Sequence, residues 1–174
     1  MVVPPALDTL TVEQSGIYRR FPANLTQYML LAAENVEPYM QLGYSFRNIS
    51  VPAQDRETVI LRIGCLRQCA YELMQHIDIA RRAGVDDGVI ANLICGATSF
   101  GEPRIDRLVA YVDAALDNRL TPQIMADLGQ HYDDTQIAEI SMLTGHYVMT
   151  AIFLQSLDVP LDASPTEWPG ELPH

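Results

Sequence analysis

The sequence predicts an all-α protein of seven or eight helices in one domain. Apolar residues recur every three to four positions in several separate segments, which is typical of one buried helix face. Residue types that favour helix caps stand at the starts of these segments, and glycines stand at several of their ends. No segment alternates apolar and polar residues convincingly enough to indicate a strand. The 174 residues suffice for one domain with its own hydrophobic core.

The first half of the chain is expected to hold an arm followed by four helices. Residues 1–20 contain two prolines and little periodicity, which indicates an N-terminal arm. Helical spacing begins at Asn24, a favourable N-cap, and the last of the four helices is expected to stop at Gly84. In order, these helices are predicted to begin near Asn24, before Tyr39, near Gln54 and near Ala70.

The second half carries clearer boundary signals. Asp86 is a candidate N-cap for a short helix that ends at Gly96. Pro103 and Pro122 each stand where proline is tolerated, in the first turn of a helix.

A last and most apolar helix is predicted over residues 134–156. Asp133 and Gln136 form a capping-box pattern at its start. Prolines and a glycine then mark residues 158–174 as a C-terminal tail, so the helical domain is expected to span residues 21–157.

The charge balance excludes several function classes. The chain carries 22 acidic and 11 basic residues, for a net charge of −11, which argues against a nucleic-acid binder and against an anionic membrane surface as partner. All bases are arginine, so lysine-based Schiff-base chemistry and the P-loop lysine are excluded. The longest run without a fixed charge, residues 140–157, contains Gly145, His146 and Gln155 and is interpreted as a buried helix rather than a membrane span.

Cysteine and histidine usage indicates a cytoplasmic protein without a cofactor. Three cysteines are too few for a disulfide scaffold, and the N-terminal segment lacks the basic region of a signal peptide. The four histidines show no close pairing, so we expect no metal site. His146 is interpreted either as a residue of a ligand pocket or as a buried histidine bonded to a backbone carbonyl.

Residues 56–84 carry most of the groups that could do chemistry. On one continuous helix, Cys65, Cys69, Glu72 and His76 would fall within a stripe about 60° wide. A thiol, a carboxylate and an imidazole on one stripe could perform acid–base or nucleophilic catalysis. The alternative is structural: small apolar cysteines, a solvated glutamate and a buried histidine.

The same segment resembles the carboxymuconolactone decarboxylase and alkylhydroperoxidase D (AhpD)-like family, which has an all-helical fold. Redox members of that family carry Glu, eleven residues, Cys, two residues, Cys, three residues and His. Here these positions hold Glu57, Cys69, Glu72 and His76, so a glutamate replaces the second cysteine. Three short segments resemble the branch without the cysteine pair: RETVILR, AYELMQH and ARRAGV. The likeness extends over roughly residues 35–161.

The resemblance implies a homotrimer or homohexamer with small-molecule pockets among its helices. In the branch without the cysteine pair, it implies cofactor-free acid–base chemistry on a small carboxylated or lactone-type substrate. His76 would be the general acid/base, and Glu72 or Glu57 would orient it or share its proton.

Three neighbouring residues have open roles under this resemblance. Tyr71 is either a donor to a substrate oxygen or a packed tyrosine. Arg62 and Arg67 are the nearest arginines that could hold a substrate carboxylate, or both are solvated.

Two alternative functions remain open at this point. One is a thiol peroxidase that acts through Cys69, although Glu72 stands where the family places the peroxide-attacking thiol. The other is an oligomer that binds a small molecule without catalysis.

Spacing gives a geometric condition on the site. Glu57 and His76 are nineteen residues apart, which on a straight helix is roughly 28 Å. They can share a pocket only if the chain turns between them or if two subunits build the pocket. We expect a break between Arg67 and Ala70, which would place Cys69 at a helix N-terminus, where a thiol pKa is lowered.

Overall fold

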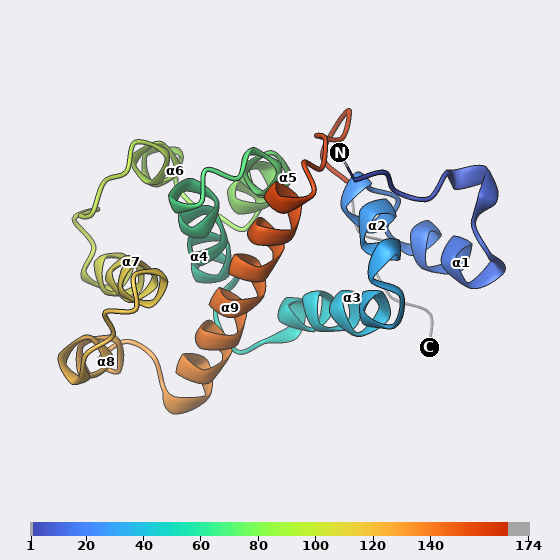
Figure 1. Cartoon of the computed structure of the whole chain (residues 1–174). Helices are drawn as coiled ribbons and strands as arrows, with labels where there is room; N and C mark the ends of the chain where they lie inside the picture. The colour runs from blue at the N-terminus through green and yellow to red at the C-terminus, as the bar shows by residue number, and fades with distance from the viewer. Residues whose placement is uncertain (1, 167–174) are drawn as a thin grey trace.

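Helix α9 (Asp134–Ser156) runs through the middle of the molecule, between the helices of residues 53–128 and those of residues 12–45 (Figure 1). The computed structural model describes residues 2–166. Every regular element in that part of the chain is helical, which confirms the all-α class predicted from the sequence.

The helices expected from the sequence are all present, close to their predicted limits. The capping box of Asp133 and Gln136 opens α9, and Asp86 and Thr121 cap two shorter helices through their side chains. Before α9, the helices are α1 (Val12–Arg20), α2 (Asn24–Met29), α3 (Val36–Ser45), α4 (Ala53–Leu66), α5 (Ala70–Arg82), α6 (Asp87–Ile94), α7 (Pro103–Leu116) and α8 (Pro122–Leu128).

Part of the segment expected to be an arm is helical. Thr11 and Gln14 form a capping box at the start of α1, and the buried side chain of Ile17 joins the core. Because Ile17 is the one buried residue of this short helix, the segment lacks the apolar repeat by which the other helices are recognised in the sequence.

The chain breaks between α4 and α5, as expected. Gln68 has a positive φ of 53°, and the backbone N–H of Cys69 donates to the carbonyl oxygen of Gly64 at 2.8 Å. Gly64 also permits the two helices to approach closely, because a Cβ there would lie 3.0 Å from Leu73 Cδ2. The two helices therefore fold back on each other as a closely packed pair.

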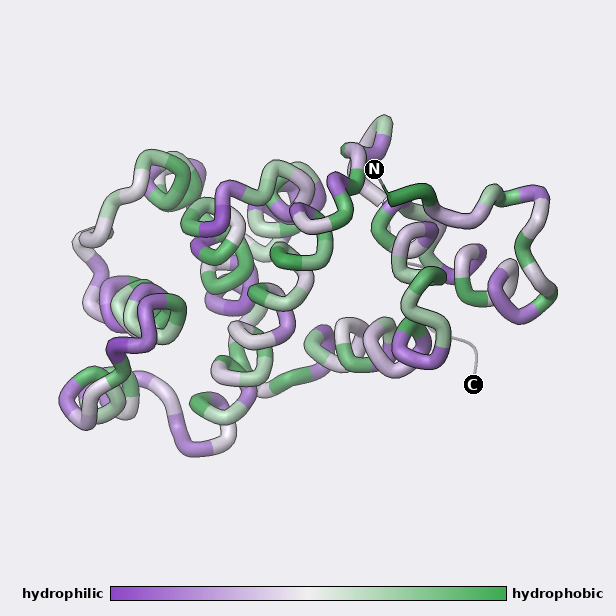
Figure 2. Tube along the Cα trace, viewed as in Figure 1, coloured by the Kyte–Doolittle hydropathy of each residue, from purple (hydrophilic) through white to green (hydrophobic). Residues whose placement is uncertain are grey.

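Helix α4 lies at the centre of the hydrophobic core. Val59, Ile60 and Ile63 pack against side chains of α7 and α9, whereas Leu61 packs toward α5 and α6. Hydrophobic residues prevail along α9 (Figure 2). Among the helices of the described residues, it is the one that is long and apolar enough to cross a membrane. Its inner side chains lie in the core beside α4, so its apolar character matches the interpretation of a buried helix.

Candidate functional site

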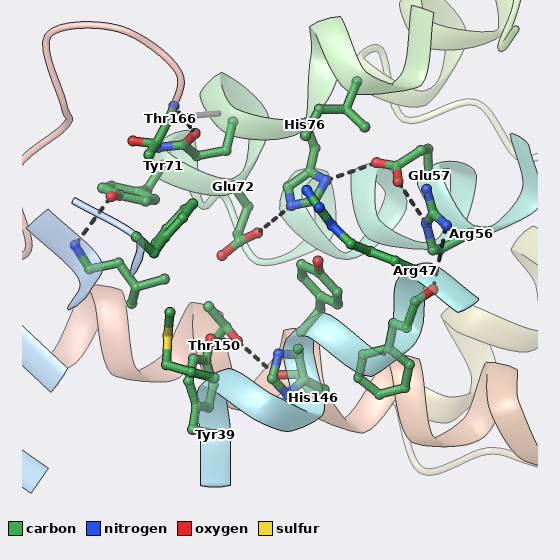
Figure 3. A pocket seen from close by; sticks show the side chains of 18 residues that line it. Tyr39, Arg47, Arg56, Glu57, Tyr71, Glu72, His76, His146, Thr150 and Thr166 are labelled. Atoms are coloured by element: carbon green, nitrogen blue, oxygen red, sulfur yellow. Dashed lines mark hydrogen bonds and ion pairs between the residues drawn. The ribbon is translucent and has the colours of Figure 1, made fainter. Parts of the chain in front are cut away.

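A cavity of about 320 Å³ lies among α3, α4, α5, α9 and the segment that follows α9 (Figure 3). Its apolar wall comes from residues of the N-terminal half, including Phe21, Leu25 and Met40. Its polar side chains come from six parts of the chain and are Tyr39, Arg47, Arg56, Glu57, Tyr71, Glu72, Gln75, His76, His146, Tyr147, Thr150 and Thr166.

His76 lies between two carboxylates in this cavity (Figure 3). Its Nδ1 is 2.8 Å from Glu57 Oε2, and its Nε2 is 3.6 Å from Glu72 Oε2. The other oxygen of Glu57 accepts a hydrogen bond from Arg56 Nε at 2.9 Å. The break between α4 and α5 brings Glu57 opposite His76, and Glu72 reaches the ring because it lies one helical turn before His76 on α5.

The environment of Glu57 favours its ionised form. Burial raises the pKa of this carboxyl, but the charge and hydrogen bond of His76, together with Arg56, outweigh burial and hold the pKa below its usual value. Glu57 is therefore a carboxylate at neutral pH and accepts the hydrogen bond from Nδ1.

Glu72 has the opposite behaviour. Burial raises its pKa to about 7, because the favourable charge of His76 only partly compensates, and the charge of Glu57 raises the pKa further. Burial lowers the pKa of His76, but the charge and hydrogen bond of Glu57 and the charge of Glu72 outweigh it and raise the pKa above its ordinary value. The site thus holds one ionised carboxylate, and a second carboxyl that exchanges its proton near neutral pH.

His146 lies on the opposite side of the cavity from His76, next to Tyr39 (Figure 3). The two rings stack with centroids 4.7 Å apart, and His146 meets Tyr147 edge-on at 5.3 Å. Burial and the charge of His76 lower the pKa of His146 to about 4, so its ring is neutral at physiological pH. It lines the cavity, as one of the two interpretations held, but its buried Nδ1 has no hydrogen-bond partner among residues 2–166.

One family model matches the central helices of the chain. Residues 36–114 match the model of the carboxymuconolactone decarboxylase family. This segment is similar to that family. It runs from α3 into α7 and contains Glu57, Glu72 and His76, so the resemblance noted in the sequence is confirmed.

Two solved structures share the fold at low sequence identity. A protein of unknown function from Agrobacterium tumefaciens, provisionally described as an antioxidant defence protein AhpD, has a TM-score of 0.71 at 16% identity, over 79% of this chain and 97% of that chain. The alkylhydroperoxidase AhpD core of an uncharacterised peroxidase-related protein from Ralstonia eutropha has a TM-score of 0.78 at 11% identity, over 93% of this chain and 92% of that chain. No curated protein matches the chain in sequence. These likenesses establish the fold.

Cys69, the thiol at the family's first cysteine position, does not line the cavity. It is buried at the N-terminus of α5, where a lowered pKa was expected; burial and the charge of Glu72 instead raise the pKa, despite hydrogen bonds from the backbone. Burial likewise raises the pKa of Cys65, which is half-buried near the end of α4. At this site, desolvation therefore raises the thiol pKa by more than the helix N-terminus lowers it.

The two arginines considered for a substrate carboxylate lie elsewhere. Arg62 is buried and makes two hydrogen bonds of 2.6 Å with Asp113 on α7. Arg67 lines a separate, smaller hollow of about 160 Å³. The arginines in the cavity are Arg47, from the turn after α3, and Arg56, from the first turns of α4. Sequence reasoning missed both, although Arg56 directly precedes Glu57.

Tyr71 belongs to the cavity wall, but its hydroxyl is engaged with other parts of the chain. It donates to Asp162 Oδ2 and accepts from the backbone N–H of Leu25. Asp162 also accepts from Gln75 Nε2 at 2.8 Å and from the backbone N–H of Asn24 at 2.8 Å. The segment after α9 therefore closes one end of the cavity, which the expectation of a simple tail did not foresee.

Among the described residues, no group of three or more His, Cys, Asp or Glu side chains has an arrangement that could hold a metal ion. The polar side chains that line the cavity carry carboxyl, imidazole, hydroxyl, amide and guanidinium groups.

Proposed function

We propose that this chain is an enzyme that performs cofactor-free acid–base catalysis on a small carboxylated or lactone-type molecule bound in the cavity. The observation that carries the proposal is the position of His76 between Glu57 and Glu72. The pKa of Glu57 is lowered from its usual value, and that of Glu72 is raised. Two carboxyl groups whose environments separate their pKa values on either side of an imidazole are typical of a proton-transfer site.

The geometry supports a distinct role for each group. Glu57 accepts a hydrogen bond from the Nδ1–H of His76, which fixes the tautomer and stabilises the imidazolium form. Nε2 then faces Glu72 and can give a proton to, or take one from, a bound molecule. Because the pKa of Glu72 is about 7, this carboxyl can restore the proton to Nε2 and take another from solvent.

In loss of carbon dioxide, the bond between the carboxylate carbon and its neighbour breaks, and its electron pair moves into an adjacent carbonyl to give an enolate. His76 then delivers the Nε2 proton to the carbon that lost the carboxylate, and Glu72 reprotonates the imidazole. The net reaction replaces the carboxylate by a proton from water. Proton transfer by a positioned side chain contributes typically about 10²–10⁴-fold to the rate.

The thiol peroxidase interpretation finds less support. Peroxide reduction needs a reactive thiolate, whereas Cys69 is buried outside the cavity and its pKa is raised. Glu72 occupies the position of the second family cysteine, and a carboxylate cannot attack a peroxide as a thiolate does.

The proposal is tested by screening carboxylated lactones and β-keto acids for carbon dioxide release and for uptake of solvent deuterium at carbon. The wild-type protein is compared with His76→Asn and with His131→Asn, which changes an exposed histidine. We expect turnover by the wild type and His131→Asn, and a loss of about 10²-fold or more in His76→Asn. Equal activity of the three proteins, or binding without any turnover across the panel, contradicts catalysis through His76.

We further propose that the protein is a cytoplasmic homotrimer or homohexamer. Support for assembly comes from α9, where Met142, Met149 and Ile152 are exposed on one side of the helix. The three cysteines are free thiols, which suits a reducing compartment. Light scattering on the purified protein should give a trimer or hexamer that dissociates in Met149→Glu, and a monomeric wild type contradicts this proposal.

A further inference from the structure

We propose that Arg47, together with Arg56, binds a carboxylate of the substrate and selects anionic over uncharged molecules. This inference rests on the proposed function, since it assigns the substrate group that the same cavity recognises. Arg47 is not near the residues that the family spacing singles out, because it lies ten positions before Glu57, in a separate turn.

The two arginines come together through the backbone between α3 and α4. Arg56 Nη1 donates to the carbonyl oxygen of Phe46, the residue that directly precedes Arg47, at 3.4 Å. Both arginines line the cavity, and Figure 3 shows Arg56 beside Glu57 and the Arg47 side chain extending into the cavity in the direction of His76. Burial and the charge of Arg56 lower the pKa of Arg47, while the nearby charge of Glu57 raises it. Such proximity of like charges is favourable when an anion lies between them.

The charge of this end of the cavity opposes that of the whole chain. The protein has a net charge of −11, yet Arg47 and Arg56 contribute two positive formal charges here. His76, whose pKa is raised against the effect of burial, mainly by the charge and hydrogen bond of Glu57, adds a third positive charge whenever its ring is protonated. Glu57 contributes one negative charge, and Glu72 is partly protonated at neutral pH because burial raises its pKa to about 7. An anion is therefore attracted to this end of the cavity and away from the acidic surface elsewhere.

The chemistry indicates which carboxylate the arginines hold. A guanidinium that binds a carboxylate stabilises that group in the ground state, and such binding opposes its departure as carbon dioxide. The group held by Arg47 is therefore an anchor that stays on the product, and the reacting carbon lies toward His76. Arginine suits this role because its planar fork binds a carboxylate through two parallel hydrogen bonds.

Binding of an unreactive probe tests the inference without catalysis. γ-Butyrolactone-γ-carboxylate carries a carboxylate that is not β to a carbonyl, so it does not lose carbon dioxide readily, and its methyl ester is an uncharged match. Calorimetric titration of both compounds is performed with the wild type, Arg47→Gln, Arg47→Lys and Arg107→Gln. Arg107 is a matched control, since it is an exposed arginine on α7 that does not line the cavity.

We expect the wild type and Arg107→Gln to bind the carboxylate at least about tenfold more tightly than the ester. Arg47→Gln should lose that preference, with little change in affinity for the ester, and Arg47→Lys should recover part of it. Equal affinity for the two compounds in the wild type, absence of carboxylate binding at millimolar concentration, or equal weakening of both compounds in Arg47→Gln overturns the inference. Carboxylate binding that depends on Arg47, without turnover of any substrate in the panel, instead contradicts the acid–base function and leaves this inference standing.

Discussion

Glu57 Oε2 and His76 Nδ1 lie 2.8 Å apart, although the two residues are separated by nineteen positions in the sequence. The contact forms within one chain, because α4 ends at Leu66 and α5 folds back from Ala70. The His76 ring therefore needs no residue from a second subunit for this contact.

Replacement of Glu57 by Gln should lower the pKa of His76. The charge and hydrogen bond of Glu57 raise that pKa against the effect of burial, and burial persists in the variant. Titration of the His76 ring by NMR measures the change, with Glu13→Gln on the exposed surface as control. A pKa that stays or rises in Glu57→Gln is inconsistent with the orientation role assigned to Glu57.

Replacement of Glu72 by Gln should remove an ionisation near neutral pH from the pH–rate profile. Glu72 is the buried carboxyl whose pKa lies at about 7, and a glutamine cannot exchange the proton. We expect kcat to fall by about 10²-fold, and the limb near pH 7 to disappear. Glu34→Gln, which changes an exposed carboxyl, should leave the profile unchanged. A profile in Glu72→Gln with the wild-type limb would show that another group titrates there.

His146 should make the folded protein less stable in acid. Its folded pKa of about 4 lies below the value of about 6.5 in an unfolded chain, so the unfolded state binds more protons between these values. The stability that His146 contributes is present above the unfolded pKa and is lost as the pH falls toward the folded pKa.

This loss should amount to about 2 kcal/mol between about pH 7 and about pH 5. Urea unfolding of the wild type and His146→Gln at both pH values isolates it, because Glu72 titrates in both proteins. Equal pH dependence in the two proteins contradicts a buried neutral His146. His131→Gln provides the control for an exposed histidine.

Asp162→Ala should loosen the segment that closes the cavity. The variant loses three accepted hydrogen bonds, from Tyr71, Gln75 and Asn24. We expect the free energy of unfolding to fall by about 1–3 kcal/mol and the amides of Asn24 and Thr166 to exchange faster with deuterated solvent. Ser164→Ala, at an exposed position of the same segment, should change neither quantity. Unaltered exchange in Asp162→Ala is incompatible with a closure held by Asp162.

Local rules predicted the helix boundaries well because the residues that set them act within one turn. Asp133 and Gln136 hydrogen-bond each other's backbone at the start of α9, and Gly84 adopts a φ of 90° after α5. Helix α1 was not predicted from the sequence because its stability depends on the packing of Ile17 into a core that distant segments build.

Some residues of the candidate site could likewise be predicted from local sequence patterns, whereas others depend on the packing of distant segments. The spacing of Glu57, Glu72 and His76, with the break before Ala70, was sufficient to anticipate that these groups could meet. The cavity residues Arg47 and Thr166 could not be anticipated, since each reaches the cavity through the packing of segments far apart in sequence.

Arg62 is a residue that its position in the sequence suggested for the site but that the structure places elsewhere. It lies on α4, five positions after Glu57, but it points to Asp113 because α7 packs on that side of the helix. A helical repeat gives the relative direction of side chains, whereas the identity of their neighbours depends on how the helices pack.

The central claim is that an imidazole, and no thiol, performs the chemistry of this cavity. The most direct measurement compares turnover and hydroperoxide consumption, with a dithiol reductant supplied, in the wild type and in a variant with Cys65→Ala, Cys69→Ser and Cys95→Ser. Circular dichroism serves as the control for folding. We predict that the cysteine-free protein retains the substrate turnover of the wild type and that neither protein consumes hydroperoxide catalytically. Loss of turnover in the folded cysteine-free protein, together with peroxide consumption by the wild type alone, contradicts the claim.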